Sequence, residues 1–278
     1  MALRLAGVAV LLVLAAVVPG GCRDSRNSGA SADVAVTNSY LEAAVRDLCG
    51  DLEVMCLAPP GMCPGHFDIS PAQVRQLRDC RMLLLFDFQQ KVEANLTRLK
   101  DNGLKTYRVV GPTGLCVPDS YLAVCREVAL RLSEEYPERA TDIAGRLKVI
   151  EDRLNGLGVE LQASAQQAGA TGAEILVSNH QIEFARWLGL APVATFLGSD
   201  IETVSNIDHC LQQATGHDVR FVVANLQEGT SLAKALAERL GAKAVVFSNF
   251  PQEVGGSEGF DALARANVAA LLAEADTL

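Results

Sequence analysis

The sequence predicts an α/β protein of two lobes, each with a mostly parallel sheet of about four strands, joined by a long backbone helix. Short apolar runs alternate with amphipathic segments over residues 34–110 and again over 174–275, as in βαβ units. Between them, apolar residues recur every three or four positions from Ile143 to Leu161, which indicates a helix. A helix over 137–168 would have about 30 residues and reach about 45 Å, enough to connect two lobes.

The first lobe is expected over residues 33–136, with strands and helices in alternation. Its apolar runs predict strands at 34–37, 53–57, 81–86 and 106–110. Its periodic segments predict helices at 40–48, from Ser70 onward, at 88–100 and at 120–136. Ser70 followed by Pro71 is a typical helix start, because serine caps free N–H groups and proline suits the first helical position.

The second lobe is expected over residues 169–278 and repeats the alternation. The predicted strands are 174–178, 191–196, 221–224 and 244–247. The predicted helices are 181–188, 201–215, 231–240 and 259–275. Gly189 and Gly241 end two of these helices, because glycine readily adopts the left-handed conformation that closes a helix.

The amino-terminal residues predict export from the cytoplasm. Arg4 precedes an apolar run over 7–18, and small residues follow, so residues 1–21 are interpreted as a secretory signal peptide. The run is shorter than the roughly 20 residues that cross a bilayer. Cys22 follows two glycines and resembles the cysteine of a lipobox, although Pro19 stands where leucine is usual. We therefore expect lipid on Cys22, a polar tether over 22–32 and a location in the periplasm or on the outer face of the cell membrane. The alternative is an ordinary Cys22 beside a conventional cleavage site.

Charge and motifs exclude several function classes. The chain has 24 basic and 33 acidic residues, a net charge of −9 and no basic run, which argues against nucleic-acid binding. It has no Gly-x-Ser-x-Gly elbow, no phosphate-binding glycine loop and no His-Glu-x-x-His. A thiol enzyme built on Cys116 and His180 is the least favoured alternative, because nothing in the sequence orients that pair. We expect a protein that is not an enzyme.

Four segments, in this order, carry a family resemblance. They are VAVTNSYLEAAVRDLCGDLEVMCLAPPGMCPGHFDISPAQVRQLRDCRMLLL from residue 34, VPDSYLAVCREVALRLSEEYPERATDIAGRL from 117, ILVSNHQIEFARWLGL from 175, and VRFVVANLQEGTSLAKALAERLGAKAVVFSN from 219. Together they resemble the cluster A-I solute-binding proteins of zinc and manganese ABC transporters. The resemblance implies a receptor that holds a metal ion between its lobes and delivers it to a membrane permease. We expect it to act as a monomer.

The resemblance also implies four ligand positions. The first falls on Gly65, and a shift of one residue in this turn would let His66 serve instead. The others fall on Cys116, His180 and Asn249. His180 also follows a predicted strand at its carboxyl end, where ligands bind in open α/β sheets. His66 as a solvated loop histidine and Cys116 as a half-cystine or buried thiol remain open.

Residues near these positions extend the candidate site. Cys63 lies three residues before His66, a spacing that suits a shared metal, although a disulfide to Cys56 or Cys80 is equally open. Asp68 and Glu253 are less favoured sources of a carboxylate. His209 and His217 are expected to be solvated. Cys125 and Cys210 lie within predicted helices and are expected to be core residues or disulfide partners.

The ligand types favour zinc. Imidazole and thiolate prefer Zn²⁺ or Cu⁺, whereas hard cations prefer oxygen. Zn²⁺ is therefore the expected ion, with Mn²⁺, Fe²⁺ and Cu⁺ as alternatives. Because Gly65 and Asn249 depart from the family's ligands, a metal chelate or small organic ligand on the same scaffold also remains open.

Overall fold

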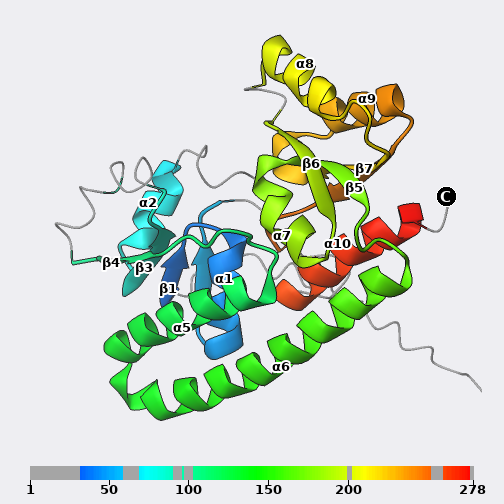
Figure 1. Cartoon of the computed structure of the whole chain (residues 1–278). Coiled ribbons are helices and arrows are strands. Elements are labelled where there is room, and N and C mark those ends of the chain that lie inside the picture. The colour runs from blue at the N-terminus through cyan, green and yellow to red at the C-terminus, as the bar shows by residue number, and fades with distance from the viewer. Residues whose placement is uncertain are drawn as a thin grey trace, which may run out of the picture. The chain divides into compact units, whose positions relative to one another are not determined.

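A parallel sheet of four strands forms the first lobe (Figure 1). The computed structural model describes residues 32–58, 69–89, 96, 103–198, 202–251 and 259–275. The strands are β1 (Val34–Val36), β2 (Val54–Cys56), β3 (Met82–Phe86) and β4 (Lys105–Val109), and the helices are α1 (Ser39–Leu48) and α2 (Pro71–Leu77). Ser70 caps α2 as expected, since its hydroxyl accepts a hydrogen bond from the Gln73 N–H. Most of the helix predicted at 88–100 lies outside the described residues.

A second sheet of four parallel strands forms the other lobe (Figure 1). Its strands are β5 (Glu174–Ser178), β6 (Ala191–Phe196), β7 (Val219–Asn225) and β8 (Lys243–Phe247). The helices are α7 (Ile182–Trp187), α8 (Val204–Gln213), α9 (Ser231–Leu240) and α10 (Phe260–Ala275). Short 3₁₀ turns, η2 (Asn179–Gln181) and η3 (Leu226–Glu228), follow β5 and β7 directly. The predicted fold class of two α/β lobes with parallel sheets is confirmed.

The two sheets share one strand order. The first runs β2-β1-β3-β4 and the second runs β6-β5-β7-β8. In each sheet the second strand therefore pairs with one edge of the first strand, and the third strand pairs with its other edge. A crevice opens at such a switch point, beyond the carboxyl ends of the two central strands. In the second sheet these strands are β5 and β7, which lead into η2 and η3. The topology therefore places the turn that contains His180 beside the turn that contains Glu228.

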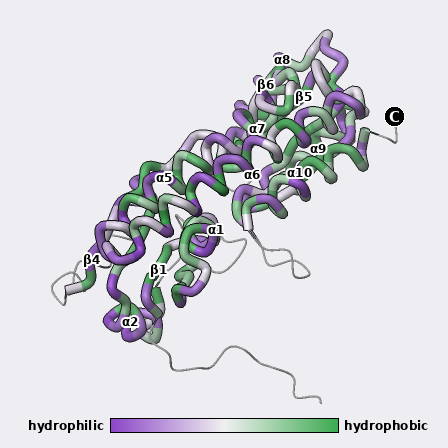
Figure 2. Tube along the Cα trace, turned by 90° about the horizontal axis from the view of Figure 1, so that it is seen from below, coloured by the Kyte–Doolittle hydropathy of each residue, from purple (hydrophilic) through white to green (hydrophobic). Residues whose placement is uncertain are grey.

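A long helix connects the lobes. Helix α5 (Pro118–Glu135) leads through a 3₁₀ turn, η1 (Pro137–Arg139), into α6 (Ala140–Gln167), which has 28 residues. At 1.5 Å per residue α6 is about 42 Å long. It packs against α5 and α1 of the first lobe and against α10 of the second. Hydrophobic and hydrophilic residues alternate along α5 and α6 (Figure 2), as expected for helices with one buried face.

One continuous hydrophobic core extends through both lobes. Alternate residues of the central strands face it, among them Leu84 of β3 and Val223 of β7. The intervening residues Leu83 and Val222 face separate clusters on the outer sides of the sheets. Both faces of each sheet are thus covered, which explains why the strands read as unbroken apolar runs.

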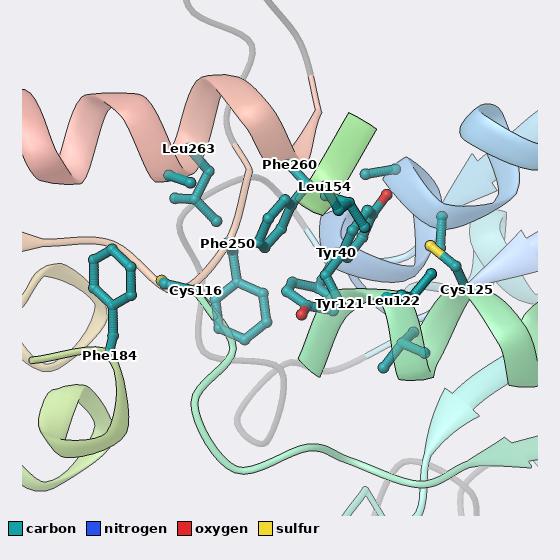
Figure 3. Close-up of a cluster of buried hydrophobic side chains, with 14 of the residues drawn as sticks. Tyr40, Cys116, Tyr121, Leu122, Cys125, Leu154, Phe184, Phe250, Phe260 and Leu263 are labelled. Carbon is teal, nitrogen blue, oxygen red and sulfur yellow. The ribbon is translucent and has the colours of Figure 1, made fainter. Parts of the chain in front are cut away.

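Aromatic rings join the lobes within this core (Figure 3). Phe260, the first residue of α10, stacks on Tyr121 of α5 with 4.2 Å between ring centroids and an interplanar angle of 4°. Tyr40 of α1 meets both rings edge-on. Nearby, Arg153 of α6 contacts Asp47 of α1 at 2.6 Å and Asp261 of α10 at 3.4 Å. The lobes are therefore joined by packing as well as by the chain.

The predicted signal peptide and lipid-bearing Cys22 lie outside the described residues. The tether predicted at 22–32 does too, except for its last residue. Among the helices that the structure describes, none is long and apolar enough to cross a membrane.

Candidate metal site

A pocket of about 430 Å³ opens between the two lobes. The first lobe contributes Phe88, which follows β3, and the loop 112–115 before α5. The second lobe contributes residues at or just beyond the carboxyl ends of β5, β7 and β8. These are Asn179, His180, Ile182, Glu183, Asn225, Gln227, Glu228, Asn249 and Phe250. The pocket thus occupies the crevice that the strand order creates.

His180 and Glu228 form the main polar pair of the pocket. The Nδ1 atom of His180 lies 2.6 Å from Oε1 of Glu228. The hydroxyl of Ser178, the last residue of β5, donates to Oε2 of the same carboxylate at 2.5 Å. The side chain of His180 is 63% exposed and that of Glu228 only 15%. An accessible imidazole is therefore supported from behind by a largely buried carboxylate.

The electrostatics of this pair favour its charged form. The hydrogen bond to Glu228 raises the pKa of His180, and this effect outweighs partial burial. Burial alone would raise the pKa of Glu228, but the hydrogen bonds from His180 and Ser178 outweigh it and hold that pKa below its ordinary value. Glu228 is consequently ionised at neutral pH and supplies a fixed negative charge beside the imidazole.

Buried amides fix the turn that carries His180. Nε2 of Gln181, a fully buried residue, donates to Oδ1 of Asn225 at 3.2 Å and to Oδ1 of Asn249 at 3.0 Å. Nδ2 of Asn249 donates to the His180 carbonyl at 3.4 Å. The amide oxygen of Asn249, the atom that would bind a metal, is thus already a hydrogen-bond acceptor. These contacts give Asn249 a structural role in the wall of the pocket.

Cys116 lies behind this wall, within the core. It is fully buried and donates to the Ser248 carbonyl, 2.9 Å from Sγ, while Nδ2 of Asn267 donates to the sulfur at 3.2 Å. Burial raises the pKa of the Cys116 thiol well above its ordinary value. A metal needs the thiolate, and here the neutral thiol is stabilised. The geometry therefore favours the buried-thiol alternative for Cys116.

Gly114 lets the first lobe approach the second at the pocket. Its φ is +73°, a backbone conformation that residues other than glycine rarely adopt. A Cβ atom there would lie 2.8 Å from Cβ of Glu183 in α7. Any other residue would combine backbone strain with a clash. Glycine at this position thus allows the loop 112–115 to reach α7.

Several candidate residues lie outside the described residues: Cys63, Gly65, His66, Asp68 and Glu253. Within the part of the chain that the structure describes, no group of three or more His, Cys, Asp and Glu side chains could hold a metal ion. Among the described residues, the pocket lining offers one imidazole, that of His180, and two carboxylates, those of Glu183 and Glu228.

The other histidines and cysteines that the structure describes do not line the pocket. His209 is exposed, and Cys125 and Cys210 are buried in the core, as expected. His217 is also exposed, but its Nδ1 lies 2.8 Å from Oε1 of Glu174, at the amino end of β5. Cys56 and Cys80, the two partners considered for a disulfide with Cys63, are free thiols.

Glu228 is not among the site residues that the sequence predicts. A signal for it was present, because Glu228 follows the strand 221–224 as His180 follows 174–178, and both strands were predicted. Carboxyl ends of parallel strands lie at the same edge of a sheet. The rule that selected His180 therefore also applies to Glu228.

Comparison with known proteins identifies the family of the chain. Residues 116–274 match the model of the ZnuA family, described as zinc-uptake complex component A, periplasmic. No curated protein matches the chain in sequence. The fold resembles the Mn-bound periplasmic metal-binding protein of Candidatus Liberibacter asiaticus, with a TM-score of 0.75, 13% identity, and coverage of 87% of this chain and 98% of that one.

Two further structures share the fold. A ZnuA deletion mutant with zinc bound has a TM-score of 0.71 and 16% identity, with coverage of 87% of this chain and 97% of that one. The laminin-binding protein Lbp of Streptococcus pyogenes has a TM-score of 0.71 and 14% identity, with coverage of 88% and 98%. At these identities the likeness establishes the fold.

Proposed function

Because the chain belongs to the ZnuA family of periplasmic zinc-uptake components, we propose that it is an extracytoplasmic receptor that binds a divalent transition metal, zinc first, and delivers it to an ABC permease. The observation that carries this proposal is the His180–Glu228 pair, 2.6 Å apart in the pocket between the lobes. An exposed imidazole backed by a carboxylate is the usual arrangement of a histidine that binds zinc.

The proposed ligand set starts from His180. His66 remains the proposed second imidazole, and Cys63, three residues before it, remains a further candidate ligand. The family resemblance placed Cys116 and Asn249 among the ligands. Asn249 is assigned to the pocket wall and Cys116 to the core behind it, because metal binding would break hydrogen bonds that each already makes. Zinc remains the expected ion, since imidazole suits Zn²⁺ better than the hard cations. Lipidation of Cys22 and action as a monomer complete the proposal.

Metal binding by the purified protein tests the proposed function. The metal-free protein should bind Zn²⁺ in isothermal titration calorimetry and melt at a higher temperature with Zn²⁺ present. An ion at 100 times its Kd stabilises the folded state by about 2.7 kcal/mol. Parallel titrations with Mn²⁺, Fe²⁺ and Cu⁺ rank the ions. The proposal is wrong if none of the four ions binds or raises the melting temperature.

A second candidate is a receptor for a chelated metal. It is favoured by the small number of metal-binding groups among the described residues and by the amides that line a pocket of about 430 Å³. Titration with preformed zinc citrate separates the two candidates. Heat from the complex, with none from Zn²⁺ alone, would favour the chelate.

Zinc affinity is expected to fall in mild acid. A protonated imidazole has no lone pair for a metal, so binding is full above the pKa of His180 and is lost as pH falls through it. Since Glu228 raises that pKa, the loss should begin at a higher pH than for an ordinary histidine. Below this pKa the apparent Kd should increase about tenfold per pH unit for each proton displaced. Calorimetric titrations between about pH 5 and 8 measure the effect, and a constant Kd over that range would contradict it.

A further inference from the structure

We propose that Glu228, held by Ser178, is a positioning residue that fixes the proton of neutral His180 on Nδ1 and so makes Nε2 the metal-binding nitrogen. This inference rests on the proposed function. It adds the identity of the binding atom and of a residue that the family resemblance did not supply.

The contact with Glu228 distinguishes the two ring nitrogens of His180. Oε1 of Glu228 lies 2.6 Å from Nδ1 of His180. An ionised carboxylate has no proton to donate, so a hydrogen bond at this distance requires the proton on Nδ1. In the neutral ring Nε2 then carries the lone pair. Neutral histidine in water prefers the opposite tautomer, with its proton on Nε2, so Glu228 reverses the intrinsic preference.

Glu228 is itself held in place by a buried serine. Its other oxygen, Oε2, accepts from the Ser178 hydroxyl at 2.5 Å, and Ser178 is buried. Ser178 ends β5 and Glu228 belongs to η3, which follows the neighbouring strand β7. The carboxylate is thus fixed by two adjacent strands of one sheet, and its position is set before any ion arrives.

Hydrogen bonds fix the backbone of His180 but not its ring. Nδ2 of Asn249 donates to the His180 carbonyl, and the next residue, Gln181, is held by Asn225 and Asn249. The main chain is therefore fixed, while the imidazole itself is 63% exposed and has little packing to hold it. Glu228 supplies the missing restraint on the ring. Loss of such a supporting residue typically weakens metal binding 10- to 100-fold.

The chain contains a matched control for this arrangement. His217 and Glu174 make the same contact, with Nδ1 and Oε1 2.8 Å apart, at the amino end of β5 and outside the pocket. Glu174→Ala removes a histidine partner without touching the candidate site.

The test has two independent readouts. Nitrogen-15 NMR of the metal-free protein, at a pH that deprotonates the ring, reports the tautomer of His180, which is assigned with His180→Ala. Wild-type protein should show the proton on Nδ1, and Glu228→Ala should move it to Nε2. Calorimetry should show zinc affinity about 10- to 100-fold weaker in Glu228→Ala and unchanged in Glu174→Ala.

The results separate this inference from the proposed function. A proton on Nε2 in the wild-type protein, or zinc affinity in Glu228→Ala within twofold of wild type, overturns the inference. Should the wild-type protein bind no metal, the proposed function fails, while the tautomer still decides whether Glu228 orients the ring. If Glu228→Ala does not fold, Glu228→Gln serves instead. It keeps the size and one accepting oxygen without the charge. Its zinc affinity should be weaker than that of the wild type, and an affinity within twofold of wild type would overturn the inference.

Discussion

Zinc binding should weaken by more than about 100-fold when His180 is replaced by alanine, beyond the loss expected for a residue that only supports a ligand. The change removes the one imidazole that lines the described part of the pocket. Competitive titration against a chelator of known affinity measures the loss. His217→Ala is the matched control, because it removes an exposed histidine whose carboxylate partner, Glu174, lies at the amino end of β5, outside the pocket.

The His180 variant should remain folded. Because its side chain is 63% exposed, the substitution forms no cavity in the core. A melting curve close to that of the wild type would show that the loss of affinity is local. Wild-type affinity in a folded His180→Ala would contradict both the ligand assignment and the role of Glu228.

Cys116→Ala separates the two ligand sets considered above. If Cys116 is a buried thiol of the core, zinc affinity in Cys116→Ala should stay within a few-fold of wild type. Stability should fall, because the variant leaves Asn267 and the Ser248 carbonyl with fewer partners. A loss of affinity as large as that of His180→Ala would return the thiol to the ligand set.

Most of the fold could be predicted from the sequence because both sheets are parallel and covered on both faces. Their strands therefore stand out as apolar runs such as Met82–Phe86. The long helix was visible because its apolar stripe continues through Gly156 and Gly158, and neither glycine interrupts it. Its first turn differs from expectation, since Pro137–Arg139 form a 3₁₀ turn before the α-helix begins at Ala140.

The candidate site was less predictable because it depends on neighbours that are distant in the chain. His180 could be placed at a strand end from its local sequence alone. Its pairing with Glu228, 48 residues away, depends on β5 and β7 being adjacent, which follows from the strand order. For Cys116, residues that are distant in the chain argue against the role that the local sequence suggests. Position along the chain suggested a ligand, whereas Ser248 and Asn267, more than 100 residues later, bury the thiol.

Removing the ring of Phe260 is expected to lower the free energy of unfolding by about 3–5 kcal/mol, the usual cost of replacing a buried phenylalanine with alanine. Phe260 is 1% exposed and stacks on Tyr121, with Tyr40 edge-on to it. Because these rings come from α10, α5 and α1, the cavity would form where the two lobes meet. Urea denaturation of Phe260→Ala, followed by circular dichroism, measures the loss.

Three further variants test whether the effect arises from the ring itself. Phe260→Leu keeps most of the volume and should cost less than half as much as alanine. Val149→Ala, at a residue of α6 that is 60% exposed, should change stability by no more than about 0.5 kcal/mol. Tyr40→Phe removes a buried hydroxyl that has no hydrogen-bond partner among the described residues, so it should be neutral or stabilising. If Phe260→Ala costs no more than Val149→Ala, the aromatic cluster does not hold the lobes together, and the long helix with its Arg153 ion pairs would have to carry that role alone.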